Sequence, residues 1–240
     1  MADNDQAGLH GSVLDQLGLL ITSGEFVPGQ VLRIEQLESR FGVSRSVIRE
    51  AIRVLEAMGM VSSRRRVGIT VAPRASWNLF DPQIIGWRLE GEGRDEQLRS
   101  LSELRRGIEP VAAALAARRA TPGQCGTLTG AVMQMAVHGR SGDLEAYLDA
   151  DIVFHRTLLE ASGNEMLGAL GDVVAAVLTG RTHHHLMPTR PEPKAISWHA
   201  EVAQAVQAGD AASAERAMRD IVEEATQAML SSDAPPPGTH

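Results

Sequence analysis

Cysteine, aromatic residues and lysine are all scarce in this chain of 240 residues. Cys125 is its one cysteine, which excludes an internal disulfide framework and a zinc site built on several thiolates. Aromatic residues make up 3% of the chain and hydrophobic residues 43%, so a core must be packed mainly from leucine, alanine and valine. No apolar run approaches the ~20 residues that span a bilayer, and the N-terminus lacks a signal-peptide pattern. We therefore expect a cytoplasmic protein with no membrane segment.

Positive charge is concentrated in one part of the chain. The net charge is −7, and Lys194 is the single lysine, so nearly every cation is an arginine. Residues 32–74 hold nine arginines against four acidic residues, whereas residues 75–240 hold 14 basic and 22 acidic residues. Because phosphate repels an acidic surface, any affinity for nucleic acid must lie in the first part.

Two short helices are predicted in this basic stretch. Apolar residues recur at helical spacing over residues 34–41, and a tight turn follows. Ser44 then begins a second helix as its N-cap, where its hydroxyl can accept a hydrogen bond from a first-turn amide. One face of this helix carries the apolar residues Val47, Ile48, Ala51, Leu55 and Met58, and the other carries Arg45, Ser46, Arg49 and Arg53.

A basic hairpin is predicted directly after the second helix. Gly59 ends that helix, and two strands over residues 60–63 and 69–72 flank a turn over residues 64–68. Helix, turn, helix and hairpin in this order indicate a winged helix-turn-helix, whose second helix enters the major groove of double-stranded DNA. The alternative is an ordinary helical hairpin with a solvated arginine face, which the local excess of positive charge disfavours.

The segment FGVSRSVIREAIRVLEAMGMV, residues 41–61, resembles the signature of GntR-type bacterial regulators. Residues 26–29, Phe-Val-Pro-Gly, fit the segment that precedes this signature in the family. The resemblance implies that the arginines of the second helix contact bases or phosphates, that its serines and one wing arginine contact phosphates, and that a wing glycine enters the minor groove. These residues are Ser44, Arg45, Ser46, Arg49, Arg65 and Gly68.

The fold class is mainly α, because the chain after residue 95 is predicted to be almost entirely helical. Pro110 should kink the first of these helices, and Asp81 with Pro82 begins a connecting helix. The predicted helices cover residues 10–21, 95–118, 121–138, 142–161, 164–186, 193–208 and 210–230. The expected domains are a winged helix-turn-helix (1–74), a linker and connecting helix (75–94), an all-α bundle (95–230) and a disordered tail (231–240).

Three residues of the predicted bundle form a candidate metal site. Asp151 and His155 are four residues apart and so project from one helical face, while His199 lies on another helix. A carboxylate with neutral imidazoles suits Zn²⁺ or a similar divalent ion. By spacing alone the commoner arrangement is a plain helix-surface pair. The run 183–185, three consecutive histidines, cannot chelate one ion because its members point in different directions.

Residues 100–230 resemble the FCD effector domain of one GntR subfamily, through SELRRGIEP (102–110), the Asp-x-x-Phe-His of 151–155 and the segment from His199 to Asp210. Many such domains hold a metal with one Asp and three His. The resemblance assigns the first three of these four positions to Asp151, His155 and His199. The fourth position falls on Ile221, which cannot ligate. Three ligands leave positions for water or an effector. The alternative is a metal-free pocket with a buried Asp–His pair, as in the acyl-CoA-responsive branch.

Arg105 is the candidate for binding an effector's carboxylate, since guanidinium groups match carboxylates at two points. In the family, the arginine of this helix points into the pocket; the alternative is a surface pair with Glu109, four residues on. Arg181 is a second candidate. Residues 71–91 resemble sugar-acid-responsive members of the family, which implies a sugar acid or another small hydroxycarboxylate as the effector.

Together these features predict a homodimeric, ligand-responsive repressor of a sugar-acid catabolic operon. Two winged helices related by a two-fold axis would bind a pseudo-palindromic operator. Two other classes of protein are the alternatives: a metalloenzyme that activates water at Asp151, His155 and His199, and a purely architectural DNA binder. The metalloenzyme is disfavoured because no nucleophile or general-base motif accompanies the metal candidates. The architectural DNA binder is disfavoured by an acidic bundle with an internal polar cluster.

Overall fold

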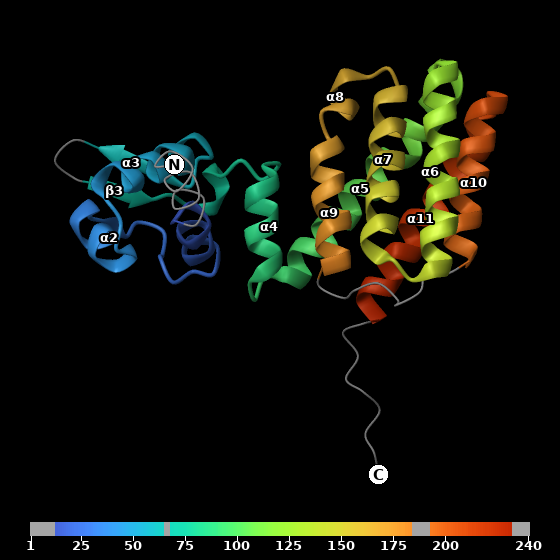
Figure 1. Ribbon diagram of the computed structural model, residues 1–240. Coiled ribbons are helices and arrows are strands. Elements are labelled where there is room, and N and C mark those ends of the chain that lie inside the picture. The colour runs from blue at the N-terminus through green and yellow to red at the C-terminus, as the bar shows by residue number, and fades with distance from the viewer. Residues whose placement is uncertain (1–12, 65–67, 184–192, 232–240) are drawn as a thin grey trace, which may run out of the picture. The chain divides into compact units, whose positions relative to one another are not determined.

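The computed structural model describes residues 13–64, 68–183 and 193–231 (Figure 1). The chain divides into two compact units, residues 1–97 and 98–240. No helix within the described residues is both long and apolar enough to cross a membrane. Apart from Ser231, the tail predicted at 231–240 lies outside the described residues.

A helix-turn-helix and a small antiparallel sheet form the N-terminal unit (Figure 1). Gly42 ends the first helix of the motif with φ +65°, a left-handed conformation that glycine adopts without steric cost, and its amide donates to the carbonyl of Glu38. In chain order the elements are helical residues 13–22, β1 (Val31–Leu32), α2 (Ile34–Phe41), α3 (Arg45–Ala57), β2 (Val61–Arg64), β3 (Gly68–Val71), the 3-10 helix η1 (Arg74–Ser76) and α4 (Pro82–Glu90).

The sheet has one strand more than the sequence predicted. Its order is β1-β3-β2, and β3 pairs antiparallel with both neighbours. The strands predicted at 60–63 and 69–72 are β2 and β3, each displaced by one residue. β1 was missed because a two-residue strand is too short to display the alternation by which strands are recognised.

The core of the N-terminal unit also includes α4. The α3 residues Ile48, Ala51 and Leu55 are fully buried, as the predicted apolar stripe requires. Trp87 of α4 packs into the same core, and its indole nitrogen donates to Asp15 Oδ1 at 3.0 Å. A Cβ at Gly18 would lie 2.4 Å from the Trp87 ring, so only glycine permits this close approach. The connecting helix is therefore part of the N-terminal unit.

The C-terminal unit is a bundle of helices, in which α6, α7, α9 and α10 stand side by side (Figure 1). One helix predicted over 164–186 is two helices, because glycines 168 and 171 flank a break and glycine is unfavourable inside a helix. α5 continues through Pro110. The bundle elements are α5 (Arg94–Arg119), α6 (Pro122–Ser141), α7 (Leu144–Ala161), α8 (Glu165–Gly168), α9 (Gly171–His183), α10 (Pro193–Ala208) and α11 (Ala211–Ser231).

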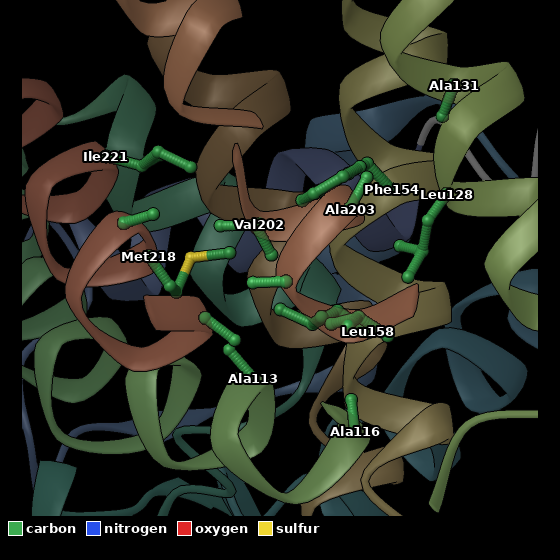
Figure 2. Close-up of a cluster of buried hydrophobic side chains, with 14 of the residues drawn as sticks. Ala113, Ala116, Leu128, Ala131, Phe154, Leu158, Val202, Ala203, Met218 and Ile221 are labelled. Carbon is green, nitrogen blue, oxygen red and sulfur yellow. The ribbon is translucent and has the colours of Figure 1, made fainter. Parts of the chain in front are cut away.

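Leucine, valine and alanine fill most of the bundle core, as the scarcity of aromatic residues predicted. Figure 2 shows Leu128 of α6, Phe154 of α7, Val202 of α10 and Met218 of α11 gathered in one interior. Ile221 of α11 belongs to the same apolar cluster and is 4% exposed. The position at which the family resemblance places a fourth metal ligand is therefore occupied by an ordinary core side chain.

Candidate functional site

The exposed face of α3 carries most of the residues predicted to contact DNA. The backbone of Ser44 is extended, and its carbonyl accepts hydrogen bonds from the amides of Val47 and Ile48, which sets the start of the helix. Because Ile48 is fully buried, the opposite face of α3 is turned to solvent. Ser44, Arg45, Ser46 and Arg49 are all exposed there.

The Ser44 side chain does not cap α3, contrary to the sequence prediction. Its hydroxyl lies 2.8 Å from the hydroxyl of Ser46, and it makes no capping hydrogen bond to the helix. The two hydroxyls contact each other at this turn, and the Ser44 hydroxyl does not accept a hydrogen bond from a first-turn amide. Both remain at the surface beside the helix N-terminus, where the backbone favours anions.

The two arginines of the predicted contact surface differ in their partners. Arg45 forms an exposed ion pair with Glu35 of α2, at 3.1 Å between Nη1 and Oε1. The pKa of Glu35 is lowered by a hydrogen bond with its own backbone and by the charge of Arg45. Arg49 has no carboxylate at ion-pair distance among the described residues, so its guanidinium is available for an anionic partner.

Gly68 lies at the start of β3, paired with Arg64 across the wing. Its φ is +105°, a conformation that residues with a side chain rarely adopt. A Cβ there would also approach Val31 Cγ1 to 3.2 Å. The wing geometry therefore requires this glycine independently of any contact with DNA. Arg65 lies outside the described residues.

A cluster of charged side chains is buried inside the C-terminal unit. It draws residues from α5, α7, α9 and α10, and each of them is at most 7% exposed. Burying so many charges is unfavourable unless they compensate one another. The cluster comprises Arg105, Glu109, Asp151, His155, Arg181 and His199, and includes every residue that the sequence nominated for metal or effector binding.

Asp151, His155 and His199 bring one ligand atom each to a common point. The Nε2 atoms of the two imidazoles lie 3.3 Å and 3.2 Å from Asp151 Oδ1, and a donor atom from each residue lies within 4.8 Å of the others. None of these three atoms makes a well-aligned hydrogen bond. Buried polar atoms without hydrogen-bond partners are costly, and a divalent cation such as zinc would bind all three residues.

The second nitrogen of each imidazole faces an acceptor. His199 Nδ1 donates to the carbonyl of Ala195 at 2.7 Å, so Nε2 is the ring nitrogen that faces Asp151. His155 Nδ1 lies 2.5 Å from Glu109 Oε2, a close charge contact whose alignment falls short of a hydrogen bond. Both rings therefore present Nε2 to Asp151.

Glu109 lies between Arg105 and His155. Arg105 Nε is 2.5 Å from Glu109 Oε1 and Nη2 is 3.4 Å from Oε2, with both side chains at most 2% exposed. Burial by itself raises the pKa of Glu109, but Arg105 and His155 outweigh it and lower the pKa to about 2. Arg105 and Glu109 therefore do form the pair that their spacing predicts as an alternative, but in the interior of the unit and not at its surface.

The imidazole of His155 is held between two carboxylates. Burial lowers its pKa, whereas Glu109 and Asp151 raise it, with a net value of about 8. For Asp151, burial raises the pKa, but the nearby His155 and His199 side chains lower it well below its ordinary value. Without a metal, His155 is therefore mainly in its charged form at neutral pH, with a proton on both ring nitrogens. A metal ion has to displace one of these protons.

Arg181 of α9 is the least compensated cation of the cluster. It is 7% exposed, and its Nε has no hydrogen-bond partner. Burial lowers the pKa of Arg181, and the positive charge of Arg105 lowers it further, while Asp151, Glu224 and Tyr147 oppose the shift. An anion placed between the two guanidinium groups would relieve both the burial and the repulsion.

The histidine run contributes little to this site within the described residues. His183, the last residue of α9, is exposed, and its Nε2 lies 3.4 Å from Glu145 Oε2 at the surface. Residues 184 and 185 lie outside the described residues. Glu109 is a member of the buried cluster that the sequence did not predict. Its spacing of four from Arg105 indicated only a surface pair.

Comparison with known proteins identifies both units. Residues 9–71 match the family "bacterial regulatory proteins, gntR family", and residues 100–224 match the FCD domain. The chain is 30% identical over 213 residues to the galactonate operon transcriptional repressor of Escherichia coli, covering 88% of this chain and 92% of that protein. It is also 30% identical over 214 residues to the transcriptional regulator LutR of Bacillus subtilis, with 83% and 91% covered.

A solved structure of a Streptococcus agalactiae GntR protein has the same fold, with a TM-score of 0.51, 24% identity, and coverage of 91% of this chain and 99% of that one. These relatives are regulators of transcription and not enzymes, which removes the metalloenzyme alternative. An arginine-bearing α3 in a winged helix-turn-helix is the operator-binding part of such proteins. The chain thus belongs to the gntR family of bacterial regulatory proteins, as a transcriptional regulator with a C-terminal FCD domain.

Proposed function

We propose that the chain is a repressor of a sugar-acid catabolic operon and that a small carboxylate effector, bound in the buried cluster, releases it from its operator. The similarity to the galactonate operon repressor across 88% of this chain supports this class of effector. The observation that carries the proposal is the pair of buried guanidinium groups, Arg105 and Arg181, of which Arg181 has an unpartnered Nε.

The same cluster fits a divalent metal ion, which we propose to be zinc. Asp151, His155 and His199 would hold it, since their convergent atoms lack aligned hydrogen bonds. Bound there, the ion would act as a Lewis acid toward oxygen ligands. Because Ile221 supplies no fourth ligand, coordination positions remain for water or for an oxygen of the effector.

Charge balance explains why the effector should be an anion. The buried cluster contains two arginines and two carboxylates, Glu109 and Asp151, so a divalent cation bound by Asp151, His155 and His199 would leave the cluster with a net positive charge. A carboxylate can accept hydrogen bonds from a guanidinium at two points, and a neighbouring hydroxyl can reach the metal. A small hydroxycarboxylate meets both requirements.

We propose that the protein acts as a homodimer, in which two winged helices contact the two halves of a pseudo-palindromic operator. Effector binding then shifts the dimer from an arrangement that fits the half-site spacing to one that does not. This shift cannot exceed the difference in the effector's affinity for the two arrangements. Arg45 and Arg49 would contact bases or phosphates, and Ser44 and Ser46 phosphates.

A thermal-shift screen of sugar acids, run with and without a metal chelator, tests the proposal. We expect galactonate or a related hydroxy acid to raise the melting temperature of the zinc-loaded protein, with a smaller rise after chelation. The same ligand should release a DNA fragment from upstream of the protein's own gene in a gel-shift titration. If no sugar acid alters either measurement, the proposed effector class is wrong.

A second candidate is a metal-free regulator that responds to an acyl-CoA. The apolar Ile221 at the fourth ligand position favours it, because a core isoleucine cannot complete a four-residue metal site. The chelator arm of the screen separates the two functions. A thioester ligand that stabilises the protein equally with and without zinc would support this candidate and exclude the first.

A further inference from the structure

Glu109 makes two contacts that no other carboxylate among the described residues combines. One oxygen, Oε1, lies 2.5 Å from Arg105 Nε, and the other, Oε2, lies 2.5 Å from His155 Nδ1. The Glu109 side chain is fully buried, and Arg105 and His155 are 2% and 1% exposed. One carboxylate thus connects an effector candidate on α5 with a metal-ligand candidate on α7.

We propose that Glu109 is a positioning residue, which orients His155 toward the metal and links the metal to the effector-binding guanidinium of Arg105. This inference rests on the proposed function. A carboxylate facing Nδ1 keeps the proton on that nitrogen, so Nε2 carries the lone pair that binds the metal. Glu109 Oε2 lies 2.5 Å from His155 Nδ1, close enough for the carboxylate to attract the proton on that nitrogen.

The shared carboxylate also gives the two ligands a reason to bind cooperatively. When the effector's carboxylate takes hydrogen bonds from Arg105, Arg105 withdraws less charge from Glu109. Glu109 then becomes a stronger acceptor for the Nδ1 proton, and Nε2 of His155 becomes more basic toward the metal. By thermodynamic linkage, the metal raises the affinity for the effector by the same factor.

The first test compares zinc affinity in the full-length protein before and after Glu109→Gln, by competition with a chromophoric chelator. We expect the affinity to fall about 10- to 100-fold, the range typical for the loss of a group that holds a metal-bound histidine. Glu103→Gln is the matched control, because Glu103 is an exposed carboxylate on the same helix. It should leave the affinity unchanged.

The same titration repeated with saturating galactonate measures the linkage. In the wild type, zinc should bind more tightly when the sugar acid is present, and in Glu109→Gln this enhancement should shrink. A merely structural contribution from Glu109 would lower stability without removing the enhancement. Equal zinc affinity and equal enhancement in the variant and the wild type would overturn the inference.

A second measurement needs no substitution and remains decisive if Glu109→Gln does not fold. In the zinc-loaded wild type, ¹⁵N NMR of the histidine rings should show His155 protonated at Nδ1 and metal-bound at Nε2. The opposite arrangement would overturn the role of Glu109. If the wild type binds no zinc, the proposed metal site fails and this inference with it, whereas zinc binding with an unaffected variant defeats this inference alone.

Discussion

The two units of the protein use arginine in opposite ways. On α3 of the N-terminal unit, Arg45 and Arg49 are exposed, and the one ion pair that Arg45 makes is solvated. In the C-terminal unit, Arg105 and Arg181 are buried to 2% and 7% exposure. An exposed guanidinium can exchange water for phosphate at little cost, whereas a buried one depends on a fixed counter-charge. The first arrangement suits binding to a polyanion, and the second suits selection of one small anion.

The largest effect is expected from removing the counter-charge of a buried carboxylate. Arg105→Ala leaves Glu109 in the interior with His155 alone, which should lower the free energy of unfolding by about 3–5 kcal/mol. Arg106→Ala, at an exposed position of the same helix, should change it by less than about 0.5 kcal/mol. Urea unfolding followed by circular dichroism measures both. Equal effects would mean that burial does not distinguish these arginines.

A substitution on α3 is expected to weaken DNA binding while leaving the stability of the protein nearly unchanged. Arg49→Ala should weaken operator binding by about 1–3 kcal/mol, because a guanidinium contact to a base or phosphate is lost, and should leave the unfolding free energy within about 0.5 kcal/mol. A gel-shift titration at fixed salt gives the affinity, and Arg106→Ala serves as a control of equal charge change. Unchanged affinity would remove Arg49 from the contact surface.

The pH dependence of thermal stability should differ between the metal-free and the zinc-loaded protein, because of the buried His155 in the C-terminal unit. The folded pKa of His155, about 8, exceeds its ordinary value of 6.5, so its contribution to stability is complete below pH 6.5 and is lost as the pH rises through 8. The melting temperature should therefore fall over this range by a few degrees. Bound zinc would replace the Nε2 proton of His155, so the zinc-loaded protein should not show the same fall in melting temperature. If the melting temperatures of the metal-free and zinc-loaded proteins fell equally over this pH range, His155 would not be a metal ligand.

The smallest effect concerns two helix N-caps, one in each unit. Ser44 makes no capping bond to α3, whereas Thr121 and Gln124 form a reciprocal capping box at the start of α6. Thr121→Ala should cost about 1 kcal/mol of unfolding free energy, and Ser44→Ala less than about 0.5 kcal/mol. Thermal unfolding of the two variants provides the comparison. A larger loss from Ser44→Ala would show that its hydroxyl caps the helix in solution.

Periodicity predicted the helices and the wing, because each long helix buries one face. The sequence also nominated Asp151 and His155 on one face of a helix and His199 on another helix, and the structure brings the three side chains together. Burial of the pair Arg105–Glu109 was not predictable, since a spacing of four occurs equally in exposed and buried pairs. Only the packing of α5 against α7 brings Glu109 to His155. The break between α8 and α9 and the two-residue β1 were too short to appear in the pattern.

The contact between Gly18 and Trp87 bears on how a signal could travel along the chain. With no side chain at Gly18, the Trp87 ring lies directly against the backbone of helical residues 13–22, and its indole is tied to Asp15. These contacts hold α4 against the rest of the N-terminal unit. A displacement of the chain beyond Glu90 would therefore be transmitted through α4 to the whole winged helix-turn-helix.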